Sequence, residues 1–153
     1  MIPLLSSCPG RQLVDIKCGD GFLQIIGVGF AAGDFSGAMM VRYKQDNLFD
    51  SSIDSGSVTL STVTADTFLL WSHAPYVLAG YDYKLTLPAI SKTYVITNIT
   101  QSGHTHRSVP THDPPYHCVN KMVSCNVNGA ELPIDSSRMD LVMYAADTLY
   151  LPK

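Results

Sequence analysis

The sequence predicts an all-β protein, folded as a single-domain antiparallel β-sandwich or jelly-roll-like structure over residues 1–153. Its 153 residues suit one domain with a buried core. Apolar and polar residues alternate in many short segments, which is typical of half-buried strands. Gly, Asn and Asp cluster between these segments, and no stretch has a convincing helical period.

The expected strands recur at near-regular spacing, as in a sandwich or barrel. They are residues 12–17, 22–30, 38–44, 57–63, 67–71, 81–87, 93–99, 119–127 and 141–151. Turn residues separate several of them, as in CGDG at 18–21, AAGDFSG at 31–37 and NVNG at 126–129.

Residues 137–146 come nearest to a helical pattern, and Asp135 or Ser136 could cap such a helix. The end of this segment, AADTLYL at 145–151, echoes TADTFLL at 64–70. We interpret both echoes as strands that begin at an Asp-Thr turn. An internal duplication is a further interpretation of the same echo.

The charge pattern gives no sign of nucleic-acid binding. Ser and Thr (26 residues) outnumber Asp, Glu, Lys and Arg (23), and the net charge is −3. The ten Lys and Arg residues form no run that could follow a phosphate backbone. The longest apolar clusters are broken by Gly and Gln, so no membrane span is expected. The opening MIPLLSSCPG lacks the charged and apolar regions of a signal peptide, which predicts synthesis in the cytoplasm.

The four cysteines, at positions 8, 18, 118 and 125, have none of the C-x2-C spacings of zinc sites. Two interpretations are open. Cys8 with Cys18, and Cys118 with Cys125, could each form a disulfide across a hairpin, or the thiols could be reduced and buried.

Aromatic residues such as Trp71, Tyr81 and Tyr83 lie in expected strands beside polar neighbours. This placement favours packing within and between strands. A sugar-binding face would use the same residue types, so a carbohydrate-binding β-sandwich module, with a host glycan as ligand, is the alternative function.

Four of the five histidines lie in a His- and Pro-rich segment, predicted to be a loop at 102–118. His104 and His106 fall on one side of an extended chain, where two imidazoles can converge on one metal ion. His112 and His117 follow and could add ligands, as could Asp113 and Cys118. The other interpretation is a solvated loop without metal.

The stretch SGHTHRSV at 102–109 resembles the Gly-x-His-x-His stretches of bacteriophage tail fibres and short-fibre collar regions. In those fibres three parallel chains each give two histidines to one axial metal ion. The resemblance implies that His104 and His106 bind a transition metal ion, Fe or Zn, in a trimer. It covers eight residues, and Pro110, Pro114 and Pro115 depart from a regular fibre strand.

We therefore expect a structural or adhesion subunit of a virus particle, such as a decoration, tail or receptor-binding protein, located in the virion. Its expected partners are further copies of itself, with a trimer preferred, and other virion proteins. We expect no enzymatic activity, because no G-x-S-x-G, H-E-x-x-H or phosphate-binding loop is present. A metal-dependent enzyme that uses His104, His106, Asp113 and His117 is the remaining interpretation.

Overall fold

A computed structural model describes residues 21–46, 48–72, 75–108, 116–135 and 147–153; within 104–119 it describes the strand backbone alone. The strands are β1 (Leu23–Val28), β2 (Met39–Lys44), β3 (Ser52–Thr64), β4 (Thr67–Ser72), β5 (Tyr81–Leu87), β6 (Lys92–Ser108), β7 (Tyr116–Val127), β8 (Ala130–Pro133) and β9 (Asp147–Pro152). Two short 3-10 helices, η1 (Ala32–Phe35) and η2 (Pro88–Ile90), complete the described elements. Neither is long or apolar enough to cross a membrane.

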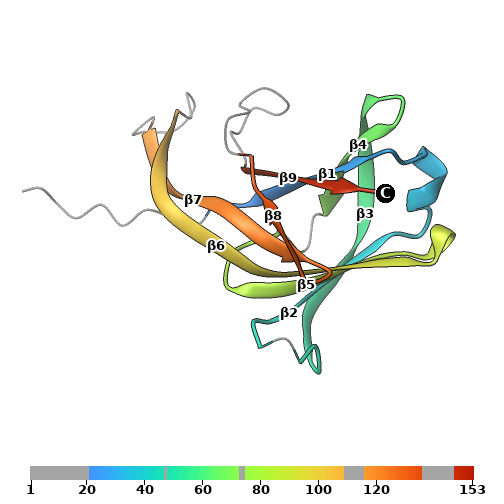
Figure 1. Cartoon of the computed structure of the whole chain (residues 1–153), viewed down its shortest axis with the longest axis horizontal. Coiled ribbons are helices and arrows are strands. Elements are labelled where there is room, and N and C mark those ends of the chain that lie inside the picture. The colour runs from blue at the N-terminus through green and yellow to red at the C-terminus, as the bar shows by residue number, and fades with distance from the viewer. Residues whose placement is uncertain (1–20, 47, 73–74, 109–115, 136–146) are drawn as a thin grey trace, which may run out of the picture.

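The described strands form one mixed sheet that nearly closes into a barrel (Figure 1). Their order is β8-β7-β6-β5-β2-β3-β4-β1-β9. Strands β1 and β9 run parallel, whereas the other neighbouring strands pair antiparallel. The predicted all-β fold class is thus confirmed, with a coiled sheet as its architecture.

Strand β3 bends, and through this bend the sheet coils from one side of the barrel to the other. Its residues 52–57 pair with β2, and its residues 58–64 pair with β4. The change of partner follows Gly56, and Val58 N–H then donates to the carbonyl oxygen of Ala38 at 3.0 Å. A glycine suits such a bend because it has no side chain to pack on either face.

The core fills the space that the coiled sheet encloses. Fully buried residues include Tyr83, Leu85, Ile96, Met122 and Leu149. An aromatic cluster of Phe30, Phe35, Phe68 and Tyr94 packs beneath η1. A Cβ atom on Gly27 would lie 2.9 Å from Phe35 Cζ, so only glycine leaves room for these rings.

The two ends of the sheet meet through backbone and side-chain hydrogen bonds. Asp135 and Thr148 exchange two backbone hydrogen bonds of 2.8 Å. The buried carboxylate of Asp147 accepts a hydrogen bond from Met122 N–H at 2.8 Å. Tyr94 donates its hydroxyl proton to the carbonyl oxygen of Pro152 at 2.8 Å. These contacts join β9 to β6, β7 and the end of β8, and so hold the barrel nearly closed.

Most strands agree with the sequence prediction, and β5 has the predicted bounds. Strand β8 was missed because its four residues are too few to show alternation. The expected strand at 12–17 and most of the possible helix at 137–146 lie outside the described residues. The AADTLYL and TADTFLL echoes contribute β9 and β4, which flank β1 on opposite sides and run in opposite directions relative to it.

The segment predicted to be a loop at 102–118 is partly strand. Strand β6 continues to Ser108 and β7 begins at Tyr116, so the prediction was wrong at both ends of the segment. The segment contains Thr105, Tyr116 and Val119, residue types that favour strands. Pro110, His112, Asp113, Pro114 and Pro115 lie outside the described residues.

The barrel closure gives a first prediction. Replacing Asp147 with Ala removes the acceptor of the buried Met122 N–H, so the free energy of unfolding should fall by about 1–3 kcal/mol. Asp66 occupies the equivalent place in the TADTFLL echo but is exposed, and Asp66→Ala is the matched control. Urea denaturation of both variants measures the difference, and equal losses would contradict the role of Asp147 in closure.

The structure also decides between the two interpretations for Cys125. Its thiol is free and fully buried. Cys118 and Cys125 lie on the same strand, seven residues apart, which is about 23 Å along an extended chain. A disulfide across a hairpin is therefore not made by this pair, and the buried-thiol interpretation is confirmed for Cys125. Cys8 and Cys18 lie outside the described residues.

Burial raises the pKa of the Cys125 thiol to about 11, from 9.0. The unfolded chain then releases this proton at lower pH than the folded protein does. The stabilising contribution of the neutral thiol is complete below pH 9 and is lost between pH 9 and 11.

Accordingly, the free energy of unfolding should fall between pH 8 and 10 by about 1 kcal/mol more in the native sequence than in Cys125→Ala. Urea denaturation under reducing conditions at the two pH values provides the test. An identical pH dependence in both proteins would show that Cys125 does not titrate as inferred.

Candidate binding pocket

A pocket of about 440 Å³ opens at one end of the barrel. It lies among β1, β2, β3, β4 and the segment 75–78 that follows β4. Its lining is mainly apolar and includes Leu23, Ile25, Met40, Val58, Leu70 and Val77. The volume falls within the range of about 300–1,000 Å³ that is usual for small-molecule sites.

The strand register explains why these apolar side chains meet. Leu70 on β4 pairs with Ile25 on β1 and with Leu60 on β3, so the three residues share the inner face of the sheet. Val58 pairs with Ser72 on the same face, two residues further along. The pocket is therefore the part of the barrel interior that the core residues leave open at this end.

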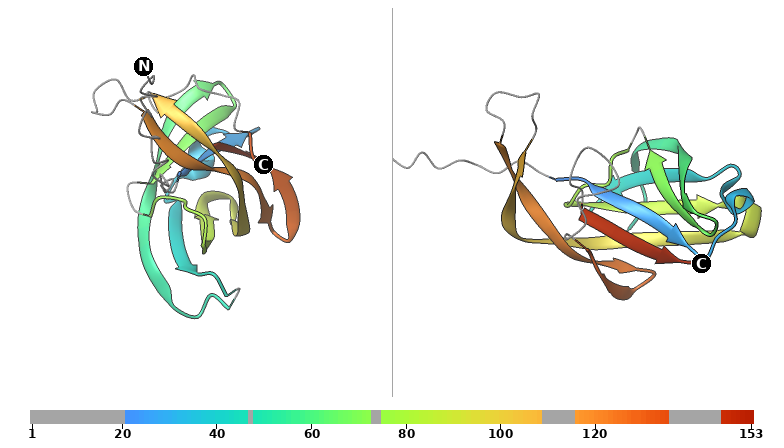
Figure 2. Two further views of the ribbon diagram at one scale, coloured as in Figure 1. Left: turned by 90° about the vertical axis from the view of Figure 1, so that its left-hand side faces the viewer. Right: turned by 90° about the horizontal axis from the view of Figure 1, so that it is seen from above.

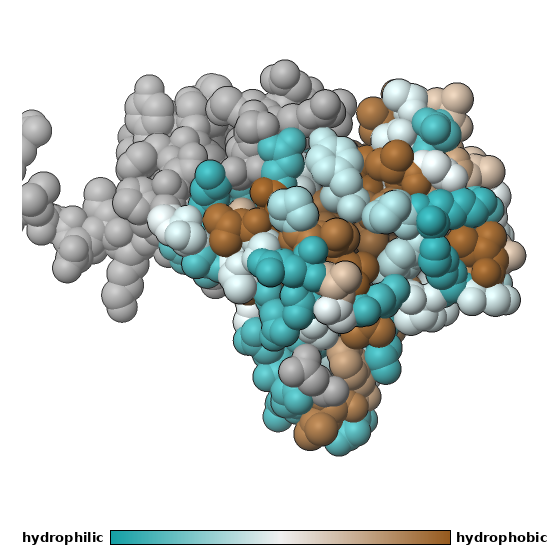
Figure 3. All heavy atoms as spheres, viewed as in Figure 1, coloured by the Kyte–Doolittle hydropathy of each residue, from teal (hydrophilic) through white to brown (hydrophobic). Residues whose placement is uncertain are grey.

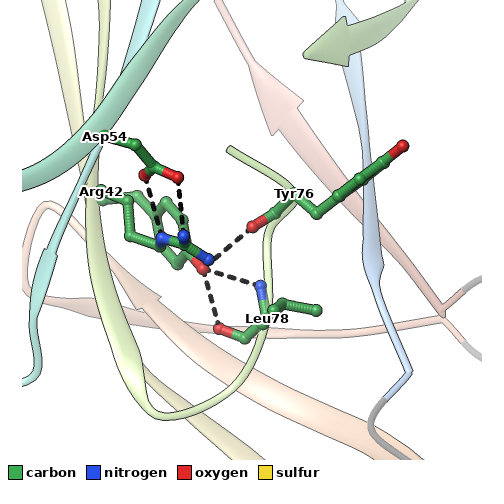
Figure 4. A network of polar contacts seen from close by, with 5 residues as sticks. Arg42, Asp54, Tyr76 and Leu78 are labelled. Carbon is green, nitrogen blue, oxygen red and sulfur yellow. Dashed lines mark hydrogen bonds and ion pairs between the residues drawn. The ribbon is translucent and has the colours of Figure 1, made fainter. Parts of the chain in front are cut away.

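Tyr83 anchors the segment that forms one wall of the pocket. Its side chain is buried on β5, and its hydroxyl oxygen accepts a hydrogen bond from Leu78 N–H at 2.8 Å (Figure 4). The hydroxyl can donate its one proton to the carbonyl oxygen of Tyr76, 3.1 Å from Oη, or to that of Leu78, 3.2 Å from Oη. Leu23 N–H also donates to the Val77 carbonyl at 2.7 Å. The wall is thus fixed from β5 and from β1.

An ion pair lies behind this wall. Arg42 and Asp54 on β2 and β3 form a bidentate contact, with N–O distances of 2.9 and 2.6 Å (Figure 4). The guanidinium of Arg42 also stacks over the Tyr81 ring, 4.7 Å from its centroid. Burial raises the pKa of Tyr83 to about 12, although the Leu78 N–H and Arg42 oppose the shift. The phenol therefore keeps its proton, and its donor function, throughout the neutral range.

Two polar side-chain atoms of the lining residues are buried without a hydrogen-bond partner. They are Ser72 Oγ and Gln24 Nε2, and both are closed to solvent. Gln24 alternates with Leu23 and Ile25 and so lies on the other face of β1. Ser72 is on the inner face, where its unpaired hydroxyl destabilises the fold rather than stabilising it.

The two hydroxyl groups near the pocket provide a matched pair of substitutions. Tyr83→Phe leaves the Leu78 N–H and the Tyr76 carbonyl without their partner, so we expect the free energy of unfolding to fall by about 1–3 kcal/mol. Ser72→Ala removes a hydroxyl that has no partner and should leave stability unchanged or slightly raised. Chemical denaturation compares them. A larger loss for Ser72→Ala than for Tyr83→Phe would contradict both assignments.

The predicted metal ligands are on a different part of the molecule. His104 and His106 lie on β6, where His104 pairs with Asn120 and His106 with Cys118. They are two residues apart on one strand, so their backbone positions share one face of the β6–β7 ribbon, as predicted. His117 pairs with Arg107, which places it at a position of the opposite face.

Metal binding stays a prediction. Among the residues whose side chains are described, no group of three or more His, Cys, Asp or Glu is placed to hold a metal ion. His112 and Asp113 lie outside the described residues. The pocket itself was not found from the sequence, because its lining residues look like ordinary core residues of several strands. The one hint was the SHAPYVL segment at 72–78, which interrupts the alternating pattern.

Comparisons with known proteins add no relative. No family model matches the chain, and no curated protein or solved structure is significantly similar to it. The functional interpretation rests on the geometry of the pocket and of the β6–β7 ribbon.

Proposed function

We propose that the protein is a structural or adhesion subunit of a virus particle, which assembles into a homo-oligomer through the far end of the β6–β7 ribbon. The observation that carries the proposal is the pairing of this ribbon. Residues 101–108 of β6 and 116–122 of β7 pair with each other and with no further described strand. We call residues 103–108 and 116–120 the arm.

The arm leaves the body of the barrel at a series of irregularities in β6. Register shifts occur between Thr97 and His104, and Asn98 and Gly103 have positive φ angles of 51° and 68°. Such bulges bend and twist a strand. The ribbon accordingly curves away from the other strands in Figure 1 and in the right panel of Figure 2.

A projecting ribbon of this kind favours assembly for a physical reason. Two strands alone are marginally stable in water. Along 105–108 of β6 and 116–119 of β7, the outer edge of each strand pairs with no described strand, and such edges readily pair with another chain. A second copy of the protein would cover these edges, which supports the homo-oligomer with a trimer preferred.

The position of His104 and His106 supports the same proposal. Both lie on the arm and on one face of it, as a shared axial ion would require. Three chains would supply six imidazoles, an octahedral set suited to a transition metal ion such as Fe or Zn. The virion setting itself is inferred from the resemblance of SGHTHRSV to phage fibre sequences.

A second projecting region offers a surface for other virion proteins or a host receptor. The hairpin that joins β2 to β3 carries Leu48 and Ile53, which are 65% and 45% exposed. Hydrophobic atoms gather at the lower tip of the molecule, where this hairpin projects (Figure 3). Apolar side chains at an exposed tip are typical of contact surfaces. The carbohydrate-binding alternative has less support, because the pocket lining offers few polar groups to a sugar.

We predict that the protein sediments as an oligomer at tens of micromolar, an order-of-magnitude range for interfaces of ordinary affinity, and contains about one metal ion per three chains if the trimer forms around an axial ion. His104→Ala and His106→Ala should each abolish metal binding and weaken the oligomer, because each substitution removes three ligands at once. His117→Ala, on the opposite face of the arm, is the control and should preserve both. Sedimentation velocity and elemental analysis measure these properties, and a monomer with no metal would refute the proposal.

The virion setting needs its own experiment. Mass spectrometry of purified particles should detect the protein at a fixed copy ratio to the major shell protein. A melting temperature that rises with a glycan, in a protein absent from particles, would instead favour the carbohydrate-binding module.

A further inference from the structure

The pocket at the barrel end is separate from the arm. It lies among β1, β2, β3 and β4, whereas the arm is formed by β6 and β7. Cores of folded proteins are close-packed, and cavities much larger than a water molecule are few. An open pocket of about 440 Å³ at the edge of such a core leaves one side of lining residues such as Val58 facing the pocket instead of other side chains.

The cavity is held open by contacts that do not depend on a ligand. Tyr83, itself fully buried, fixes Tyr76 and Leu78 through its hydroxyl group. The Leu23–Val77 backbone bridge fixes the same segment from the opposite side. Both anchors tie residues 76–78 to strands of the barrel, so this wall cannot move inward without breaking hydrogen bonds. Such a preformed cavity avoids much of the ordering cost of binding.

The lining decides what kind of molecule could fill it. Among the described lining residues none is Lys, Arg, His, Asp or Glu. A carboxylate, phosphate or ammonium group would lose its hydration there without gaining an ionic partner. The two lining residues with buried unpaired polar atoms, Ser72 and Gln24, have those atoms closed to solvent. A sugar ring would leave most of its hydroxyl groups without hydrogen bonds.

We propose that this pocket is a binding site for a small, uncharged apolar molecule, such as an aromatic ring system or a short aliphatic chain. Apolar transfer from water is worth about 25 cal/mol per Å² of buried surface, and an engineered apolar cavity of about 150 Å³ already binds benzene. The present cavity has room for a two-ring aromatic molecule. Any polar group of the ligand would remain at the mouth of the pocket, in water.

The experiment compares three probes of graded polarity by calorimetry at neutral pH: 1-methylnaphthalene, 1-naphthoate and a methyl galactoside. We expect 1-methylnaphthalene to bind at one site per chain. 1-Naphthoate has nearly the same shape and should bind at least about tenfold more weakly, because its carboxylate is charged. The galactoside should not bind.

A pair of substitutions on one strand locates the site. Val58→Trp extends a side chain from the inner face of β3 into the pocket, and should weaken 1-methylnaphthalene binding by about tenfold or more. Thr59→Trp places the same group on the adjacent exposed position of the outer face and should leave the affinity unchanged. Hydrogen exchange of the native protein gives a second measurement, in which the ligand should slow exchange in segments 22–25, 70–72 and 75–78.

Several outcomes would overturn the proposal. These are no binding of 1-methylnaphthalene, tighter binding of the naphthoate or the galactoside, equal weakening by Val58→Trp and Thr59→Trp, or protection confined to segments away from the pocket. The oligomeric state of the native protein is measured separately, so failure of this proposal leaves the assembly proposal standing.

Discussion

The rest of the structure depends on one constraint: the nine described strands form a single sheet, which coils until its two ends nearly meet. An open sheet of this composition would expose one apolar face, because its apolar residues alternate with polar ones. Coiling encloses that face, and β3 makes it possible by pairing first with β2 and then with β4. The right-handed twist of the strands determines the direction in which the sheet coils. The sheet bends after Gly56, where β3 changes its partner from β2 to β4.

Closure also determines where polar groups can be buried. The carboxylate of Asp147 is almost fully buried. The cost of burying it is offset because it accepts a hydrogen bond from Met122 N–H across the gap between β9 and β7. The exposed Asp66, at the same place in the TADTFLL echo, bonds to the hydroxyl groups of Thr64 and Thr67 instead. Similar sequences thus have different energetic roles, because one strand closes the barrel and the other lies within the sheet.

The sequence predicted the strands well where apolar residues alternate along one face of the strand. In β5, Tyr81, Tyr83, Leu85 and Leu87 mark the buried face, and the strand has the predicted bounds. Prediction was poorer where a strand lacks a core-facing side. Strand β6 continues for nine residues beyond Ile99, where polar residues give no alternation of apolar side chains. Register and strand neighbours could not be predicted, since they depend on contacts between distant segments.

The candidate site was even harder to predict from the sequence than the strand neighbours. The pocket depends on space left between Leu23, Met40, Val58 and Leu70, and each of these residues alone is indistinguishable in sequence from a packed core residue. Tyr83 was predicted to be a packing residue, and its ring is indeed fully buried. Its hydroxyl, however, bonds to a segment five to seven residues earlier in the chain, which alternation cannot reveal.

Strand β6 belongs to two parts of the molecule, the barrel and the arm. Its first half is a core strand: Tyr94, Ile96 and Ile99 are buried, and Tyr94 helps to close the barrel through Pro152. From Thr100 to Gly103 every residue is exposed, and the register shifts take the chain away from the core. Beyond this point β6 pairs with β7 alone among the described strands. The pocket, on the β1–β4 side of the barrel, is formed by other strands than the arm.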